Sequence, residues 1–463
     1  MLFRCIQCFS EYDGINKTGD YYCPSCGVQF KRIYNIPVFV TDPDDYVAKK
    51  ILFCENSIRE LEKDLLDDEN ILATTNPERY ERINNAALFQ INTLKEIQNI
   101  LLKDCSFPSV LKNIGKSQSL GYGVTFEYLI RDWSFLEECE NENAVIKQAV
   151  FSKIKGKRKR ALILGAGLGR IAIEMLDTFS EVYAIDLSIE MPFLFNKLIT
   201  ENDIRFNYFF KKNVVNDDSL FLDVHIESTY ICQKLSDNRH SIFQYLVADA
   251  ANLPFTDGSF DAIISCYFTD VVPLNSIINE LSRVLKTGGS FIHFGPLDFH
   301  FSDISQMLTL AEIADRFKEA NYQVSISDPV LQEHIALPNK FNKKVYLNQL
   351  FLAIKLNNNG QKKISGKDVL RLNAPLSFSL SGVLSETGIV QYGNAELKIK
   401  GDKTYDGALG VFEVIKCFDG KKQLSQIIRE LSAIYHIDKE TKKKIMTILA
   451  DLLATNVLGR ASV

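Results

Sequence analysis

The sequence predicts an α/β fold, with a parallel sheet and crossover helices in its largest domain. Two observations lead to this fold class. Between residues 161 and 356, short β-rich runs such as ALILG, VYAID and DAIISCYF alternate with amphipathic stretches of helical length. The first run leads into a glycine-rich turn, ALILGAGLGR, where glycines let the backbone approach a ligand closely.

The length and composition set limits on the rest of the chain. A single hydrophobic core stops growing near roughly 250 to 300 residues, so 463 residues predict two to four domains. With 46% apolar and 24% charged residues the chain is a packed globular protein, which excludes disorder or a fibrous repeat. The formal charge of −5 does not indicate a nucleic-acid partner, because such proteins usually carry a basic surface.

The chain start and its apolar runs bear on location. The opening residues, MLFRCIQCFS, lack the basic and apolar stretches of a secretory signal, and no run reaches the roughly 18 apolar residues of a membrane span. We therefore expect a cytoplasmic protein without a membrane partner.

Changes in residue pattern divide the chain into four expected domains. Residues 1–45 carry two CxxC pairs, and residues 46–150 repeat apolar side chains at helical spacing. The α/β domain follows at 151–357, and KGKRKR at its start is expected to be a solvated linker. After a polar stretch at 357–368 comes a last domain, 365–463, in which strand-like pieces precede three helical patterns. That order suggests a winged-helix-like α+β unit.

Four cysteines near the N-terminus predict a metal site. Cys5, Cys8, Cys23 and Cys26 form the pattern C-x2-C-x14-C-x2-C. Four thiolates on two turns close a tetrahedral Zn²⁺ site and leave no position for water, so the metal is expected to be structural. The alternative, a redox CxxC motif, would need a thioredoxin-like βαβ context that this segment lacks. The segment resembles a zinc ribbon.

Two acidic residues after neighbouring strands suggest which ligand the glycine-rich turn binds. The turn carries three glycines at alternate positions, Gly165, Gly167 and Gly169. Asp186 ends the second strand, where a carboxylate accepts from ribose hydroxyls, and Asp249 follows the third, where it accepts from an adenine amino group. Ala250 follows Asp249 and is expected to be part of the same site. The alternative role of the two acids is helix capping.

The order of these motifs resembles the class I methyltransferases that use S-adenosylmethionine (SAM), which have a Rossmann-like fold. LPFTDGSFDAIIS and then INELSRVLKTGGSFIHFGP supply the expected fourth strand, helix and fifth strand. The alternative cofactor is NAD, but the acid after the third strand and the KTGG turn have no place in the dinucleotide fingerprint. Separately, the cysteine segment is similar to the zinc ribbon found ahead of several methyltransferase domains, which ends in a similar IPVF strand.

Short motifs outside this generic core resemble the carnosine N-methyltransferase family over about residues 120–356. They are RDWS at 131–134, CYFTDVV at 266–272, GPLDFHF at 295–301 and the last strand, KKVYLNQLFLAI. In that family the arginine of RDW reaches the cofactor's carboxylate, which implies this role for Arg131. A guanidinium suits a carboxylate because it donates two parallel hydrogen bonds. Alternatively, RDW only docks the helical segment.

The same resemblance implies an acceptor site for an imidazole ring. The family's matching aspartate, here Asp270, holds the imidazole, and the matching histidine, His300, lies beside it. A carboxylate that accepts from the ring N–H fixes the tautomer and aims the other nitrogen at the methyl group. Tyr267 and Tyr346 are expected to complete this pocket. The alternatives are a loop-capping Asp270 and a surface His300. The family's last strand has a cluster of tyrosines, whereas this strand keeps only Tyr346.

The predicted function is therefore SAM-dependent N-methylation of an imidazole in a small molecule, peptide or protein. The last domain is similar to PqqD-like peptide-binding domains, which suggests a peptide partner. One alternative is an RNA base methyltransferase, which the net acidity disfavours. Another is a non-catalytic SAM-binding scaffold that recruits partners.

Overall fold

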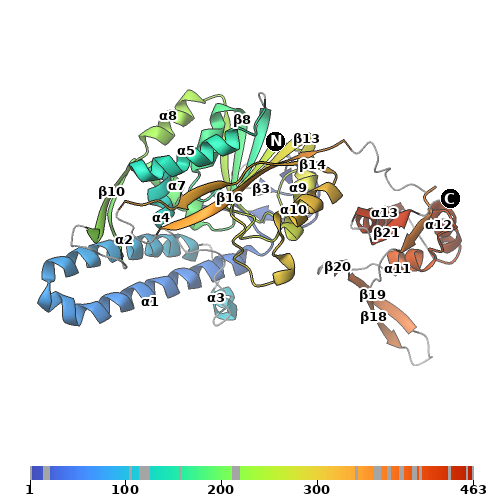
Figure 1. Ribbon diagram of the computed structural model, residues 1–463. Coiled ribbons are helices and arrows are strands. Elements are labelled where there is room, and N and C mark those ends of the chain that lie inside the picture. The colour runs from blue at the N-terminus through green and yellow to red at the C-terminus, as the bar shows by residue number, and fades with distance from the viewer. Residues whose placement is uncertain are drawn as a thin grey trace. The chain divides into compact units, whose positions relative to one another are not determined.

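The computed structural model divides the chain into two compact units, residues 1–356 and 357–463 (Figure 1). The structure describes residues 3–13, 21–103, 107–113, 126–155, 158–210, 219–338, 343–357, 367–372, 377–384, 390–398, 404–405, 409–435, 439–454 and 457–460. Among them no helix is both long enough and apolar enough to cross a membrane.

A single large sheet organises the first unit and confirms the α/β, Rossmann-like fold class. Its neighbouring strands are, in order, β14 (Tyr322–Ile326), β16 (Lys344–Lys355), β13 (Leu285–Gly295), β12 (Phe260–Cys266), β7 (Arg158–Leu164), β8 (Phe179–Asp186), β11 (Ile242–Ala248), β6 (Ile36–Phe39) and β5 (Arg32–Ile33). The five strands from β13 to β11 are parallel, whereas β16 runs antiparallel to both β13 and β14. β15 (Val330–His334) pairs with the start of β16.

Both faces of this sheet are buried. Along β7 and β8, successive side chains alternate between two apolar clusters: Ile163, Val182 and Ala184 face one, and Leu162, Tyr183 and Ile185 face the other. Helices α6 (Arg170–Glu174) and α7 (Glu190–Glu201) cover the first face, and α9 (Leu274–Val284) and α10 (Leu310–Glu319) cover the second. Parallel strands covered on both sides read as continuous apolar runs, which is the pattern seen in the sequence.

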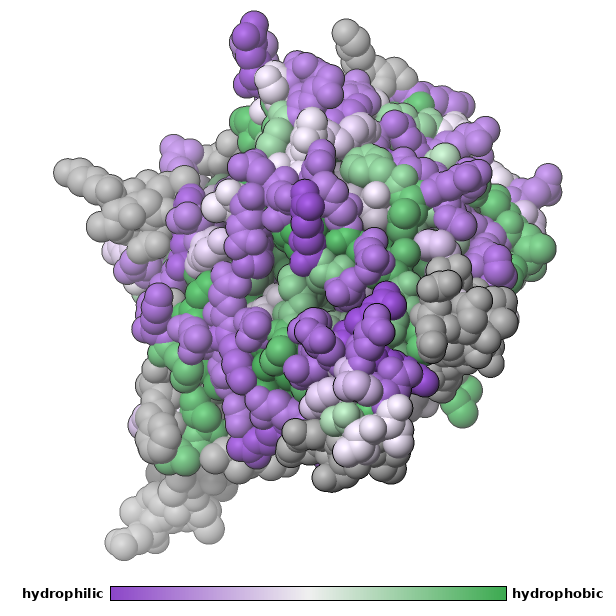
Figure 2. Space-filling model, turned by 90° about the vertical axis from the view of Figure 1, so that its left-hand side faces the viewer, coloured by the Kyte–Doolittle hydropathy of each residue, from purple (hydrophilic) through white to green (hydrophobic). Residues whose placement is uncertain are grey.

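The expected helical segment is present. It contains α1 (Pro43–Thr75), α2 (Pro77–Leu102), α3 (Phe107–Asn113), α4 (Phe126–Trp133) and α5 (Glu137–Phe151). Asn76 ends α1 and caps α2 by accepting from the Arg79 N–H, so a sharp reversal joins the two long helices. Figure 2 views the side where α1 and α2 meet and shows polar residues over most of that face, with apolar residues between them.

The cysteine-rich segment continues the large sheet. It is built from two short antiparallel pairs, β1 (Phe3–Arg4) with β2 (Glu11–Tyr12) and β3 (Tyr21–Tyr22) with β4 (Gln29–Phe30). Its last strand, β6, then pairs in parallel with β11, with Val38 opposite Val247. The three segments expected before residue 357 thus belong to one compact unit, and their separate domain boundaries stay a prediction.

One insertion was not expected from the sequence. An antiparallel pair, β9 (Asp203–Phe209) and β10 (Phe221–Glu227), followed by α8 (Thr229–Asp237), lies between β8 and β11 in the chain. Phe206 on β9 stacks on Phe89 of α2, with ring centroids 4.4 Å apart. The insertion therefore anchors the helical hairpin to the first unit.

The second unit contains strands followed by three helices, as expected. β17 (Leu370–Leu372) pairs with β21 (Leu458–Arg460), and β18 (Ser377–Leu384), β19 (Val390–Lys398) and β20 (Thr404–Tyr405) form a second sheet. Helices α11 (Leu409–Lys416), α12 (Leu424–Ser432) and α13 (Lys439–Ala454) share a core that includes Val414, Ile427 and Leu449. Its likeness to PqqD-like or winged-helix domains stays a prediction. Most of the expected linker, residues 358–366, lies outside the described residues.

Candidate active site

Apart from Tyr346 on β16, the residues singled out in the α/β domain lie at or just after the carboxyl ends of strands β7, β8, β11, β12 and β13. These strands are parallel neighbours, so their carboxyl ends meet at one edge of the sheet. This is the edge at which open α/β sheets bind ligands.

The glycine-rich turn after β7 has the backbone conformation expected of it. Gly165 and Gly167 have φ angles of 53° and 55°, a left-handed region that strains other residues. A Cβ on Gly165 would clash with the ring of Phe268, whereas one on Gly167 would meet nothing within 4 Å. Gly169 caps the start of α6. The turn therefore keeps open space above Gly167 that a ligand could fill.

Asp186 is held in place at the end of β8. One carboxylate oxygen accepts from the Gly167 N–H at 3.1 Å and the other from the Ser188 N–H at 2.9 Å. Burial raises the pKa of this carboxyl to about 6, although both hydrogen bonds oppose the rise. Each carboxylate oxygen can accept a second hydrogen bond, so Asp186 fits the ribose hydroxyls of a nucleoside cofactor.

Helix α1 supports the loop after β8, which sequence reasoning missed. The Tyr46 hydroxyl donates to the Leu187 carbonyl at 2.7 Å and accepts from the Ile189 N–H at 3.1 Å. Lys50 and Glu190 form a buried ion pair at 2.9 Å. No local pattern marks these contacts, because about 140 residues separate the partners along the chain.

Asp249 and Ala250 follow β11, next to Asp186. In the sheet Val247 lies opposite Asp186, so Asp249 comes two residues beyond that pair. Its carboxylate accepts from the Ala251 N–H at 2.8 Å, and Ala250 is buried. A cavity of about 300 Å³ lies here, lined in part by Leu187 and Asp249. This volume is at the lower end of the range for small-molecule sites.

Arg131 on α4 already has carboxylate partners. Its Nε donates to Asp132 at 2.7 Å, Glu142 lies 3.9 Å from its Nη1, and its guanidinium sits over the Tyr128 ring at 4.9 Å. Burial raises the pKa of Cys266 at the end of β12 to about 12, and the charge of Arg131 opposes that rise. Trp133 on the same helix donates from its Nε1 to the Leu168 carbonyl of the glycine-rich turn at 2.9 Å, so Arg131 lies close to the ligand edge of the sheet.

Asp270 is the least satisfied acid at this edge. It is only 4% exposed, and among the described residues its Oδ1 has no hydrogen-bond partner. Burial raises its pKa to about 7; the negative charge of Asp298 adds to the rise and Lys344 opposes it. The His300 N–H donates to the Asp270 carbonyl at 2.8 Å, which ties the segment after β13 to this loop. The structure therefore brings Asp270 and His300 together through the main chain.

Tyr267 and Tyr346 lie on the same side of the sheet edge. Their ring centroids are 6.4 Å apart. Tyr267 comes directly after β12 with a φ of 50°, which is unusual for a tyrosine. The Tyr346 hydroxyl donates to Asp298 at 3.0 Å, and Lys344 lies 4.5 Å from its ring centroid. The two tyrosines thus lie near each other, and their role as walls of an acceptor pocket stays a prediction.

Strands β15 and β16 add polar residues that sequence reasoning missed. His334 stacks on Tyr267, with centroids 4.6 Å apart, and its Nδ1 lies 3.4 Å from Glu142. Asn348 donates to the Tyr267 hydroxyl at 2.9 Å, and Gln332 donates to the Glu142 carbonyl at 2.8 Å. A sequence signal did exist, because these residues alternate along their strands and therefore share one face.

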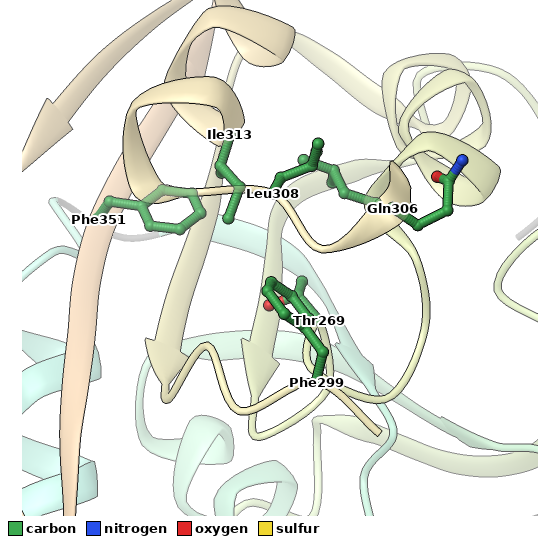
Figure 3. Close-up of a pocket in the computed structure, with 7 residues that line it drawn as sticks. Thr269, Phe299, Gln306, Leu308, Ile313 and Phe351 are labelled. Carbon is green, nitrogen blue, oxygen red and sulfur yellow. The ribbon is translucent and has the colours of Figure 1, made fainter. Parts of the chain in front are cut away.

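A small apolar hollow lies behind the Asp270 loop. Figure 3 shows Thr269 and Phe299 close together, with Leu308, Ile313 and Phe351 beyond them. Its volume of about 10 Å³ is the space of a single water, so it is a packing gap and not a substrate pocket. The Thr269 hydroxyl is paired with the His293 ring at 3.0 Å. This packing holds Thr269 and Phe299, the residues directly before Asp270 and His300, against the apolar side chains.

The four N-terminal cysteines form a cluster that could hold a metal ion. Their sulfur atoms all lie within 4.8 Å of one another, and the pairs Cys5–Cys26 and Cys8–Cys23 are 3.7 and 3.6 Å apart. A disulfide would need about 2.05 Å. Tetrahedral Zn–S bonds of about 2.3 Å place sulfurs about 3.8 Å apart, so the donor set and its spacing fit Zn²⁺.

Comparisons with known proteins point to one family. The family model of carnosine N-methyltransferase matches residues 116–356. The carnosine N-methyltransferase of Dictyostelium discoideum is 25% identical over 247 residues, which are 50% of this chain and 53% of the relative. That of Mus musculus is 24% identical over 240 residues, 46% of this chain and 56% of the relative. The chain thus spans about half the length of these relatives.

A solved SAM-dependent methyltransferase from Methanosarcina mazei is also similar. It shares 17% identity and a TM-score of 0.29, over 45% of this chain and 96% of that one. The fold assignment rests on the order of the strands described above.

Proposed function

The chain belongs to the carnosine N-methyltransferase family, and on that premise we propose that residues 116–356 catalyse SAM-dependent methylation of an imidazole nitrogen. The proposed methyl acceptor is a histidine-containing small molecule, or more widely a histidine-containing peptide or protein. The observation that carries this proposal is the buried Asp270 carboxyl, whose Oδ1 has no hydrogen-bond partner among the described residues. A buried acceptor without a partner is costly unless a ligand supplies the missing donor.

The cofactor is assigned to the β7, β8 and β11 side of the edge. Asp186 accepts from the ribose hydroxyls, Asp249 from the adenine amino group, and the Gly167 turn leaves space for the ligand. Ala250 belongs to the same wall. Arg131 would turn toward the cofactor's carboxylate, in exchange for part of its pairing with Asp132 and Glu142. The bound cofactor supplies the electrophilic methyl group.

The acceptor is assigned to the β12 and β16 side. Asp270 accepts from one ring N–H, which leaves the lone pair of the other ring nitrogen free to attack the methyl carbon. A new N–CH₃ bond forms, the C–S bond breaks, and its electron pair stays on sulfur. The ring is then positively charged until it gives its N–H proton to Asp270. A carboxyl with a pKa of about 7 suits this role, because it both accepts and releases a proton near neutral pH.

Three further residues shape this acceptor site in the proposal. Tyr267 and Tyr346 stack beside the imidazole ring of the acceptor, and His300 lies near the opposite edge of that ring.

The family name rests on residues 116–356, so the cysteine cluster and the second unit are separate assignments. We propose that Cys5, Cys8, Cys23 and Cys26 hold a structural Zn²⁺, and that residues 365–463 present a peptide.

A labelling experiment tests the proposed reaction. The full chain is incubated with methyl-labelled SAM and, in turn, carnosine, free histidine, a histidine-containing peptide and total RNA. The matched control is the carnosine analogue with phenylalanine in place of histidine. We expect label on the imidazole ring of at least one histidine compound and none on the control. Label only in RNA would contradict the imidazole assignment, and SAM binding without transfer to any acceptor would favour the scaffold.

A further inference from the structure

The cavity of about 300 Å³ beside Asp249 has walls from two distant parts of the chain. One wall comes from the ends of β8 and β11 and includes Leu187, Asp249 and Asn252. The other comes from the N-terminal 50 residues and includes Ile6, Val40 and Tyr46. All of these residues belong to the first unit. The cysteine-rich segment and the α/β domain therefore line this space together.

Direct contacts fix the first wall to the second. The Asn252 amide donates to the Ile6 carbonyl at 3.1 Å, and the Arg4 N–H donates to the Pro254 carbonyl at 3.1 Å. On the other side of the cavity Tyr46 holds the main chain around Leu187 through two hydrogen bonds. The cavity is thus a built feature with hydrogen-bonded walls.

Ile6 connects the cavity to the cysteine cluster. It lies between Cys5 and Cys8, inside the first cysteine turn, and is only 4% exposed. Two hydrogen bonds close that turn, from the Cys5 N–H to Ser10 and from the Phe9 N–H to Cys5. The position of Ile6 is therefore set by the geometry of the cysteine turn.

The chemistry of the walls suits a purine ring. Ile6 and Val40 present apolar surface to a flat ring, and Asp249 supplies an acceptor for an exocyclic amino group. Two other acids at the cavity already have partners: Asp42 accepts from the Asp45 N–H, and the Asp45 carboxylate pairs with Lys49 at 2.7 Å. Asp249 also accepts from the Ala251 N–H, but each carboxylate oxygen can accept a second hydrogen bond, so this contact leaves room for a ligand donor.

We infer that the cysteine turn forms one wall of the adenine pocket, so that zinc binding and cofactor binding are coupled. The inference rests on the proposed SAM binding and adds a role for the cluster beyond holding the N-terminal segment together. The metal keeps Ile6 against the nucleoside end of the cofactor. By reciprocity, each ligand should strengthen the binding of the other.

Calorimetry on the zinc-loaded full chain tests this. The ligands are S-adenosylhomocysteine and 5′-methylthioadenosine, which shares the nucleoside but lacks the amino acid. We expect Ile6→Ala to weaken both ligands about 3-fold to 10-fold while the zinc content stays near one per chain. The matched control is Ile33→Ala, another buried isoleucine of this segment that does not line the cavity. It should leave both affinities within about 2-fold.

A second variant and the removal of zinc complete the test. Asn252→Ala removes the hydrogen bond to Ile6 from the α/β side and should weaken both ligands without loss of zinc. Chelation of zinc from the wild-type chain should weaken binding about 10-fold, and added zinc should restore it. Unchanged affinity in Ile6→Ala and after chelation would overturn the inference, as would a loss confined to S-adenosylhomocysteine. If the wild-type chain binds neither ligand, the proposed function fails as well.

Discussion

Asp186 and Asp270 make an instructive comparison. Both follow parallel strands at the same edge of one sheet, and burial raises the pKa of each, to about 6 and about 7. Both carboxylate oxygens of Asp186 already accept from main-chain N–H groups, whereas Oδ1 of Asp270 has no partner among the described residues. The first acid is fixed before its ligand arrives, and the second lacks a donor that a ligand would bring.

The difference fits two tasks in one reaction. A cofactor that is bound and released in every cycle needs an acceptor in a constant position, and the main chain supplies that. An acceptor ring needs a group that takes a proton and gives it up again. A carboxyl that burial holds at a pKa near 7, with no fixed hydrogen-bond donor on Oδ1, suits this second task.

The largest expected effect separates chemistry from cofactor binding. Asp270→Asn keeps the shape but removes the charge, so methyl transfer should fall about 100-fold or more while SAM affinity stays within about 3-fold. The rate is measured with labelled SAM and the affinity by calorimetry. Asp298→Asn is the control, because it removes a neighbouring carboxylate that is exposed and should cost less than about 5-fold. Full activity in Asp270→Asn would contradict the proposal that Asp270 holds the imidazole ring of the acceptor.

The converse change should act on the cofactor. Asp186→Ala leaves two ribose hydroxyls without their acceptor, so SAM binding should weaken about 10-fold or more. With SAM at saturating concentration, the rate should recover more than it does in Asp270→Asn. Unchanged SAM affinity by calorimetry would mean that the cofactor does not lie beside Asp186.

A third prediction uses stability. A carboxyl whose pKa is raised on folding destabilises the folded state once it ionises, so the cost of Asp270 is absent below about pH 4 and complete above about pH 7. Asp270→Asn should therefore raise the free energy of unfolding at pH 8 by about 1 kcal/mol or more, with no gain at pH 4. Asp186→Asn should give no such gain, since its amide would face main-chain N–H groups.

The single tryptophan makes this measurable. Trp133 is fully buried in the first unit, so its fluorescence during denaturation reports on that unit alone. Equal stability of wild type and Asp270→Asn at both pH values would show that burial of the Asp270 carboxylate does not destabilise the fold. Asp270 and Asp186 would then not differ in this respect.

The smallest expected effect concerns His300. Its main-chain N–H donates to the Asp270 carbonyl at 2.8 Å. His300→Ala keeps that bond, so the rate should fall only about 3-fold, with unchanged SAM affinity. A loss as large as that of Asp270→Asn would show that the ring itself takes part in proton transfer.

The sequence predicted the order of the main strands along the chain, because each strand can be recognised from its own residues. Each strand is a short apolar run, and the acids at their ends, such as Asp186, are read directly from the chain. The antiparallel pair β9 and β10 was missed, although it forms from one local hairpin. Both strands, DIRFNYF and FLDVHIE, do alternate between polar and apolar residues, so a period-2 signal was present in the sequence and was missed.

Contacts between distant segments could not be predicted in the same way. Tyr46 and Lys50 read as ordinary residues of an amphipathic helix, yet both support the loop after β8. His334 and Glu142 are about 190 residues apart and meet beside Tyr267. Such pairs depend on the path of the whole chain, and one sequence holds no periodic pattern that records it.

The pairing of β6 with β11 has a consequence for the physical state of the protein. Without β6, the end of strand β11 at Val247 and Ala248 would be an open edge of the large sheet and would expose its main-chain N–H and C=O groups. Such an edge is a template for pairing with other chains and leads to aggregation. β5 lies outside β6 in the sheet and is only two residues long, so it presents little main chain for pairing. The cysteine-rich segment thus covers this end of the sheet edge, and we expect its loss to appear first as turbidity.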